Sequence, residues 1–494
     1  MKLRFASFAA YLFALAASLL AQADPDTIAK IVEHGKNRNR VMDHLTYLCK
    51  EIGPRLTGSP QLERACHWTA RKFREFGCKN VRLEKWGEVP VGFWRGPTQI
   101  GRMVKPYPMD FQFTSPSWSP PTKGVVRAPA VLEPQTMAEF DLVKKRLKGA
   151  WLISRAAAGG RPGGPPPQQT DEQRALAEAI AASGYAGRIT GSRNDLVHTS
   201  GRFRDLKWEA LPTEIRITVR KKDMDAIRYN LDTGKEVVLE FAMEQKFVPG
   251  PIPQYNVIAE IPGTEKPDEV VIVSGHLDSW DGPGSEGCCD NGTGTMVALE
   301  AARILNFVGA KPKRTIRFIL WTGEEQGLLG SRAYVQMHKD ELDKISCVFV
   351  DDGGTNYQGG LSCTAAMEPM LRAAIEPATK AFPEFPMQIR VVERIPRGGG
   401  SDHAPFNAVG VPGFFWFETG RADYPFIHHT QNDHLQYAIP EYLVQSSVNS
   451  ACASYVLACA ETLLPREAAA APPPAQPVRP PLELVVRLLA AVLS

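Results

Sequence analysis

Hydrophobic residues follow a helical spacing in the first part of the chain. Between residues 26 and 76 they recur every three or four positions, as at Ile28 and Ile31, which predicts amphipathic helices. A loop rich in glycine and proline at residues 53–60 separates two of these helices. Residues 90–125 are rich in proline, glycine and tryptophan and lack helical periodicity, so we expect no helix there.

Short apolar runs replace the helical pattern in the middle of the chain. Strands are predicted at residues 125–131, 150–154, 215–219 and 236–241. An alanine-rich helix is predicted at residues 172–183, after a low-complexity loop at residues 156–169. These elements indicate a small α+β module, which we expect to be inserted as a unit at residues 116–246.

The last large region alternates strands with helices. Strands are predicted at residues 269–274, 315–321, 347–350, 388–392 and 413–417, and helices at residues 296–305 and 328–337. This alternation predicts a mostly parallel mixed sheet with helices on both faces, a three-layer α/β/α domain. Ligands of such sheets bind beyond the carboxyl ends of the strands. We expect residues 24–115 and 247–465 to form this catalytic domain together.

The two ends of the chain predict segments outside these domains. A basic start and an apolar run at residues 8–20 precede Ala21-Gln22-Ala23, which is typical of a secretory signal peptide. The run is shorter than the roughly 20 residues that span a bilayer, so cleavage near Ala23–Asp24 is favoured over a membrane anchor. We expect a secreted or periplasmic protein with no membrane partner once residues 1–23 are removed. Residues 466–494 form a Pro/Ala-rich linker and a short tail.

Composition narrows the class of function. The chain has 494 residues, with 57 Lys and Arg against 54 Asp and Glu and a formal net charge of +3. This balance gives no electrostatic reason to expect nucleic acid or an anionic membrane as a partner. None of the nine cysteines belongs to a Cys-x-x-Cys pair, which argues against a zinc finger or a thioredoxin-like site. Cys288 and Cys289 either form a strained vicinal disulfide or only shape their loop.

Acidic and imidazole residues gather at the ends of the predicted strands. The clusters are His276 with Asp278, Asp290, Glu324 with Glu325, Asp351 with Asp352, and His428 with His429. Taken singly, each has a plain alternative, such as a chance pair, a solvated surface or a turn. Together they indicate a divalent metal site, because buried carboxylates without a cation are strongly destabilising.

The spacing of these clusters suits two zinc ions that share one bridging carboxylate. One ion would take His276 and Asp352, and the other would take Glu325 and His429. Asp290 would bridge the two ions, opposite a bridging water molecule.

Two further carboxylates have predicted roles beside the metals. Asp278, two residues after His276, is placed to orient that imidazole. Glu324 need not bind metal, so we expect it to take a proton from the metal-activated water and pass it to the leaving amine.

These motifs resemble the co-catalytic zinc exopeptidases of the aminopeptidase and glutamate carboxypeptidase type, most of all the carboxypeptidase Q group. The matching stretches, all within residues 30–465, are Gly53–Ser59, Ser274–Asp281, Lys311–Thr315, Trp321–Gly327 and His428–Thr430. The resemblance implies that the inserted module is similar to a protease-associated domain. It also implies a possible homodimer, since relatives are often dimers.

The resemblance extends to substrate binding. Residues 401–406 resemble a segment of the wider aminopeptidase family, which implies substrate-binding roles for Asp402 and His403. Of the two late histidines, His429 precedes a threonine as the family's ligand does. His428 is then a candidate for stabilising the oxyanion, with packing beside the ligand as the alternative.

We therefore expect an exported exopeptidase that hydrolyses dipeptides or short peptides through a hydroxide bridging two zinc ions, with Glu324 as general base. The alternatives are a non-catalytic receptor-like protein on the same fold and a glutaminyl cyclase. The sequence contains neither the Gly-x-Ser-x-Gly motif of serine hydrolases nor the His-Glu-x-x-His motif of another class of zinc peptidases. The choice between aminopeptidase, carboxypeptidase and dipeptidase stays open.

Overall fold

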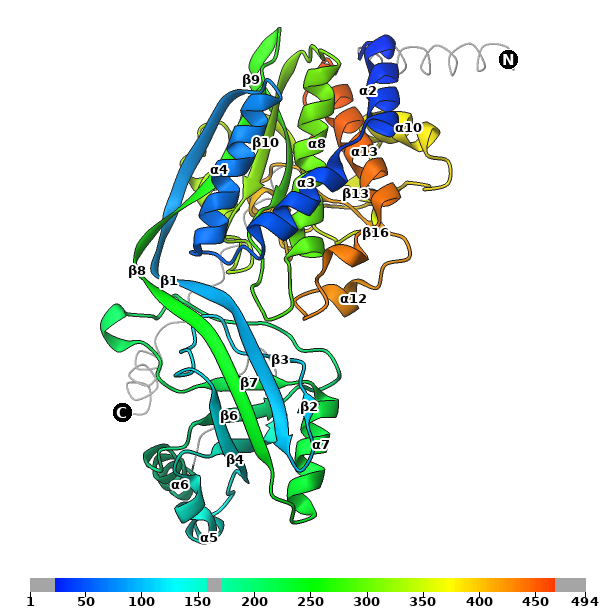
Figure 1. Ribbon diagram of the computed structural model, residues 1–494. Helices are drawn as coiled ribbons and strands as arrows, with labels where there is room; N and C mark the ends of the chain where they lie inside the picture. The colour runs from blue at the N-terminus through cyan, green and yellow to red at the C-terminus, as the bar shows by residue number, and fades with distance from the viewer. Residues whose placement is uncertain (1–22, 158–169, 467–494) are drawn as a thin grey trace, which may run out of the picture.

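The computed structural model describes residues 23–157 and 170–466. Apart from Ala23, the predicted signal peptide lies outside the described residues, as do residues 158–169 of the low-complexity loop and residues 467–494 of the tail. The described chain forms a larger lobe, which holds most of the helices, and a smaller lobe built from its middle part (Figure 1). Two long antiparallel strands, β1 (Lys79–Lys105) and β8 (Val238–Ile261), run through both lobes and join them.

Within the described residues, twelve strands form one continuous mixed sheet. Four of them are parallel neighbours in the larger lobe, in the order β15 (Gly413–Phe415), β11 (Ile345–Val350), β9 (Lys266–His276) and β10 (Arg314–Trp321). Strand β8 is antiparallel to β10 and carries the sheet into the smaller lobe. The expected mixed α/β fold with a large, mostly parallel sheet is confirmed.

The central strand β9 shows why helices cover both faces of this sheet. Its β-branched side chains alternate, so that Val271 and Val273 enter one hydrophobic core while Val270 and Ile272 enter another. The first core lies under α8 (Thr293–Phe307) and α13 (Pro440–Cys459), and the second lies under α9 (Leu329–Met337) and α11 (His403–Ala408). These two cores give the larger lobe three layers.

Further helices pack around α8 and α13. They are α2 (Pro25–Asn37), α3 (Val41–Tyr47), α4 (Pro60–Glu75) and α10 (Glu368–Ala381). Helix α4 begins where the sequence favours it, because the Ser59 hydroxyl accepts a hydrogen bond from Leu62 N and Pro60 occupies the first turn. No helix within residues 23–157 and 170–466 is both long enough and apolar enough to cross a membrane.

The smaller lobe repeats the parallel arrangement. Its strands are β4 (Val126–Leu132), β5 (Trp151–Ala157), β6 (Gly187–Gly191) and β7 (Arg216–Val219), which are parallel to one another. Short strands β2 (Met109–Asp110) and β3 (Phe113–Thr114) pair antiparallel with β1 and β7. The helices are α5 (Met137–Leu147), α6 (Asp171–Ala182) and α7 (Lys221–Asp232). Since these helices border two separate cores, the lobe is an α/β layer structure and not the expected α+β module.

Two strands go beyond or differ from the sequence prediction. Residues 90–105, for which the sequence predicts only that no helix forms, belong to β1. Strand β14 (Gln388–Val392) is at its predicted place but pairs with β13 (Gly360–Thr364) in a separate two-stranded sheet. A second small pair consists of β12 (Tyr357–Gln358) and β16 (Glu418–Thr419).

Candidate metal centre

The carboxyl edge of the larger-lobe sheet brings the predicted ligands together. His276 is the last residue of β9, Glu325 lies in the loop after β10, and Asp352 follows β11. Asp290 lies directly before α8, and His429 follows the short helix α12 (Tyr424–Ile427). Because β9, β10 and β11 are parallel neighbours, their carboxyl ends meet at one edge, as expected from the sequence.

Asp290 lies between the two histidines and faces one with each carboxylate oxygen. Its Oδ1 is 3.3 Å from His276 Nε2, and its Oδ2 is 3.2 Å from His429 Nε2. Each histidine also has a carboxylate of its own: Asp352 Oδ1 lies 3.0 Å from His276 Nε2, and Glu325 Oε2 lies 2.9 Å from His429 Nε2. The five side chains therefore form two halves with Asp290 in common.

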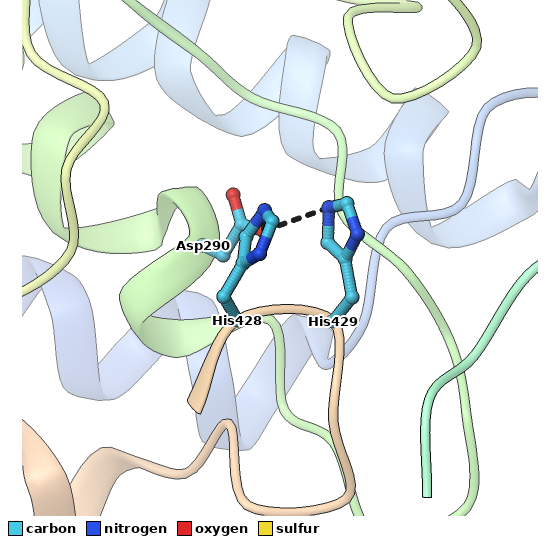
Figure 2. A group of neighbouring side chains, drawn as sticks. All are labelled: Asp290, His428 and His429. Atoms are coloured by element: carbon cyan, nitrogen blue, oxygen red, sulfur yellow. Dashed lines mark ion pairs between the residues drawn. The ribbon is translucent and has the colours of Figure 1, made fainter. Parts of the chain in front are cut away.

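His428 stands beside His429 on the same loop, and both rings face Asp290 (Figure 2). The two rings stack with their centroids 3.7 Å apart, and His428 Nε2 lies 3.7 Å from Asp290 Oδ2. The potential ligand atoms of Asp290, His428 and His429 all lie within 4.8 Å of one another, as do those of His276, Asp290 and Asp352. His428 is thus close enough to Asp290 to compete with Glu325 as a ligand.

Asp278 orients His276 as predicted, but through its backbone oxygen and not through its carboxylate. His276 Nδ1 lies 3.0 Å from the backbone oxygen of Asp278 and 3.6 Å from its carboxylate. The Asp278 carboxylate instead accepts hydrogen bonds from the Thr57 hydroxyl and from Glu324 N. A proton on Nδ1 that points to the Asp278 carbonyl leaves Nε2 free to bind a cation.

Several buried carboxylates lie close together in the centre, and this raises the pKa of two of them. Burial raises the pKa of Glu324 well above its ordinary range, and Asp352 and Asp402 raise it further against the lowering effect of His276. Burial likewise raises the pKa of Glu325 to about 7, with Asp290 adding to the shift and His429 opposing it. A cluster that holds several acids away from water is stabilised by bound cations.

Unpartnered acceptors show that the centre fits a metal. Asp290 Oδ2 and Glu325 Oε1 are buried and accept no hydrogen bond from the residues that the structure describes. Buried carboxylate oxygens normally have such partners, so these two oxygens are available as ligands for a cation. Imidazole nitrogens and carboxylate oxygens in this combination suit zinc and similar divalent metals.

A cavity of about 430 Å³ opens onto the centre. Glu324 lines it together with four of the metal-centre residues, and the remaining lining residues are Gly399, Gly400, His403, Phe415, Tyr424 and His428. His403 and His428 therefore reach the place expected for substrate. Asp402 does not line the cavity: it is fully buried behind the wall and accepts a hydrogen bond from the Ser331 hydroxyl.

Tyr424 is a cavity residue that the sequence reasoning missed. Its ring stacks on His428 with the centroids 4.8 Å apart. Burial raises the pKa of the Tyr424 phenol well above its ordinary value, and nearby carboxylates, Asp290 and Asp352 first, raise it further. The phenol thus stays protonated and can donate a hydrogen bond. The sequence signal that could have indicated this role is the position of Tyr424 one helical turn before His428 and His429.

Comparisons with known proteins find peptidases to which this chain is similar. The model of the family "Peptidase family M28" matches residues 256–453, which include all five predicted ligands. Carboxypeptidase Q of Mus musculus is 28% identical over 443 residues, which cover 89% of this chain and 90% of that protein.

Solved structures show the same fold. A peptidase M28 precursor from Shewanella amazonensis is 26% identical, with a TM-score of 0.64, and the match covers 90% of this chain and 99% of that one. A zinc aminopeptidase from Bacillus subtilis is 21% identical with a TM-score of 0.53, over 84% of this chain and 94% of that one, which supports the fold alone. The chain is therefore a metallo-exopeptidase, a hydrolase whose residues 256–453 match the model of peptidase family M28.

Proposed function

We propose that this protein is an exported exopeptidase that uses two zinc ions to hydrolyse dipeptides or short peptides. The observation that carries the proposal is the position of Asp290, whose two oxygens face two different histidines. Each of these histidines has a second carboxylate within 3.0 Å. A carboxylate placed in this way suits a shared ligand of two neighbouring metals.

The ligand assignment follows from these contacts. His276 and Asp352 would hold one zinc ion, Glu325 and His429 would hold the other, and Asp290 would contact both. Zinc is supported by the ligand types and by the relative from Bacillus subtilis, which is described as a zinc aminopeptidase. When bound, the ions would polarise the scissile carbonyl group and make a water molecule more acidic.

Glu324 is the group placed to move the proton. It lines the cavity, lies beside the ligands without pairing closely with a histidine, and has its backbone N–H fixed by the Asp278 carboxylate. This position suits a carboxylate that accepts a proton from water and returns it to the departing amine. Tyr424, protonated and in the same cavity, can donate a hydrogen bond to negative charge that develops on the substrate.

The cavity favours a small peptide with a free amino end. Besides the predicted zinc ligands, its polar lining includes Glu324 and His403, which can accept hydrogen bonds from an ammonium group. A volume of about 430 Å³ is in the range of pockets for small ligands. We therefore favour aminopeptidase or dipeptidase activity over release of a carboxyl-terminal residue. We also propose that the protein is exported and that its smaller lobe is similar to a protease-associated domain.

The test combines metal analysis with a panel of dipeptides that carry free or blocked ends. We expect two zinc ions per chain and cleavage of peptides with a free amino end, which blocking that end abolishes. Absence of cleavage with zinc supplied would favour the receptor-like alternative. Release of ammonia from peptides with an amino-terminal glutamine, without peptide-bond cleavage, would favour a glutaminyl cyclase.

A further inference from the structure

Residues 195–204 of the smaller lobe, which lie between β6 and β7, contact the loop that carries His429. Thr199 N donates a hydrogen bond of 2.8 Å to the backbone oxygen of His429. Gln431 N donates one of 3.2 Å to Val197 O, and His198 pairs with Thr430 as an isolated antiparallel bridge. The two lobes are thus joined by a short ladder of backbone hydrogen bonds directly beside a predicted ligand.

The side chain of Gln431 extends this ladder. Its Oε1 accepts a hydrogen bond of 2.7 Å from Val197 N, and its Nε2 donates to Asp195 O and to Gln112 Oε1. Only 9% of Gln431 is exposed. Both polar atoms of its side chain therefore attach the His429 loop to the smaller lobe.

His429 needs such support because its backbone is in an unfavourable conformation. Its φ of 58° lies in the left-handed region, which residues with a Cβ atom adopt rarely. Residues in this region keep their conformation only where the surrounding structure holds them. The hydrogen bonds from Thr199 and through Gln431 fix the chain at and immediately after His429.

The same segment also holds the loop of Glu325. The Arg204 guanidinium donates a hydrogen bond of 2.7 Å to the backbone oxygen of Gln326, the next residue. His276 and Asp352, in contrast, are held within the larger lobe: Thr295 Oγ1 donates to His276 O, and Asp351 N donates to Ser274 O of β9. One half of the centre thus rests on the central sheet and the other half on contact between the lobes.

We propose that residues 195–204 of the smaller lobe position Glu325 and His429 and thereby complete one of the two zinc sites, with Gln431 as a positioning residue. The inference rests on the proposed two-zinc function. It implies that loosening the contact between the lobes weakens the zinc ion held by Glu325 and His429 and leaves the ion held by His276 and Asp352 in place.

Zinc titration of the full chain, after removal of metal with a chelator, tests this directly. Gln431→Ala should leave one zinc ion bound as in the wild type and weaken the other about 10- to 100-fold, the range for residues that orient ligands. Gln431→Glu keeps an acceptor for Val197 N–H but turns a carboxylate oxygen toward Asp195 O and Gln112 Oε1, so it should lose affinity for the same ion. Gln112→Ala removes only one partner of Gln431 and should bind both ions nearly as the wild type does.

A spectroscopic signal separates positioning from a general loss of stability. With cobalt in place of zinc, Gln431→Ala should lose part of the visible absorption of the wild-type protein, and Gln112→Ala should keep it. If Gln431→Ala binds two zinc ions with unchanged affinity and keeps the cobalt spectrum, the inference is overturned even if the unfolding temperature falls. A wild type with fewer than two zinc ions would instead overturn the proposed function itself.

A second pair of variants asks the same question should Gln431→Ala not fold. Thr199→Pro removes the N–H that bonds His429 O, whereas Thr199→Ala keeps it. The proline variant should lose affinity for one zinc ion relative to the alanine variant. Equal zinc affinities in these two variants would overturn the inference.

Discussion

The continuous sheet has two groups of parallel strands, one on each side of β8, and among the described residues only the group in the larger lobe has clustered potential metal ligands at its carboxyl edge. In the smaller lobe, polar groups at the strand ends satisfy one another: Glu133, after β4, pairs with Arg188, and the Ser192 hydroxyl, after β6, donates to Asn194 O. In the larger lobe, the buried Asp290 Oδ2 and Glu325 Oε1 accept no hydrogen bond from the described residues, although Asp290 Oδ2 lies 3.2 Å from His429 Nε2. The same layout thus becomes a site only where acceptors are left available.

Removing Asp290, the ligand shared by the two proposed zinc ions, should have the largest effect on zinc binding and activity. We expect Asp290→Ala to lose zinc from both positions and to reduce peptide hydrolysis to background, because both halves of the centre use this carboxylate. Glu133→Ala, the matched change at a strand end of the smaller lobe, should keep the wild-type zinc content. Metal analysis and a dipeptide assay measure both outcomes, and an Asp290→Ala protein that still binds two zinc ions would contradict the shared role.

Neutralising Glu324 should separate binding from proton transfer. We expect Glu324→Gln to keep its zinc ions and to lower kcat by about 10²- to 10⁴-fold, the usual contribution of a general acid–base group. Glu209→Gln changes an exposed glutamate of the smaller lobe and should leave kcat unchanged. A Glu324→Gln variant with near wild-type activity would remove this residue from the mechanism.

A change at Tyr424 tests a neutral hydrogen-bond donor in the cavity of the larger lobe. Tyr424→Phe should retain zinc and lower kcat with little change in KM, by at most about 10²- to 10³-fold, as for loss of one hydrogen bond to a developing oxyanion. Tyr229→Phe, a change on the exposed surface of the smaller lobe, serves as the control. A fall in affinity for substrate with unchanged kcat would assign Tyr424 to binding instead.

Sequence patterns were sufficient where chemistry and local structure coincide. The β-branched run of β9 and the clusters after β9, β10 and β11 could be predicted because each depends on neighbouring residues and on one rule about sheet edges. The strand β1 could not, since Pro90, Pro97 and several glycines hide its periodicity, and it is held by pairing with β8 about 150 residues away.

In the site, too, contacts between distant parts of the chain could not be predicted from the local sequence. Ligand types at strand ends are visible in the sequence, but which polar atoms remain unpartnered is decided by packing. Asp402 looks like a substrate-binding residue beside His403, yet it is buried against Ser331. Tyr424 belongs to the cavity because α12 places it one turn before the two histidines, and Gln431 matters because a distant segment folds against it.

The smallest predicted effect concerns how the two lobes respond to pH. In the larger lobe, His338 lies between Glu84 and Glu341, with Nε2 3.0 Å from Glu84 Oε1, and the hydrogen bond to Glu84 raises the pKa of His338. A raised pKa in the folded state means that the protonated imidazole stabilises the fold. This contribution is complete below the unfolded-state pKa of about 6.5 and is lost as the pH rises through the higher folded-state value.

His338→Gln should therefore lower the unfolding temperature of the zinc-loaded protein at pH 6 and have little effect at pH 9. We expect a loss of about 1 kcal/mol or less at pH 6, as is usual for a partly exposed ion pair. The smaller lobe provides the control, because Arg188 pairs with Glu133 and Glu214 and a guanidinium stays charged across this range. Arg188→Gln should thus cost the same at both pH values. An equal loss for His338→Gln at pH 6 and pH 9 would show that its ring acts by packing against Tyr334 and not by charge.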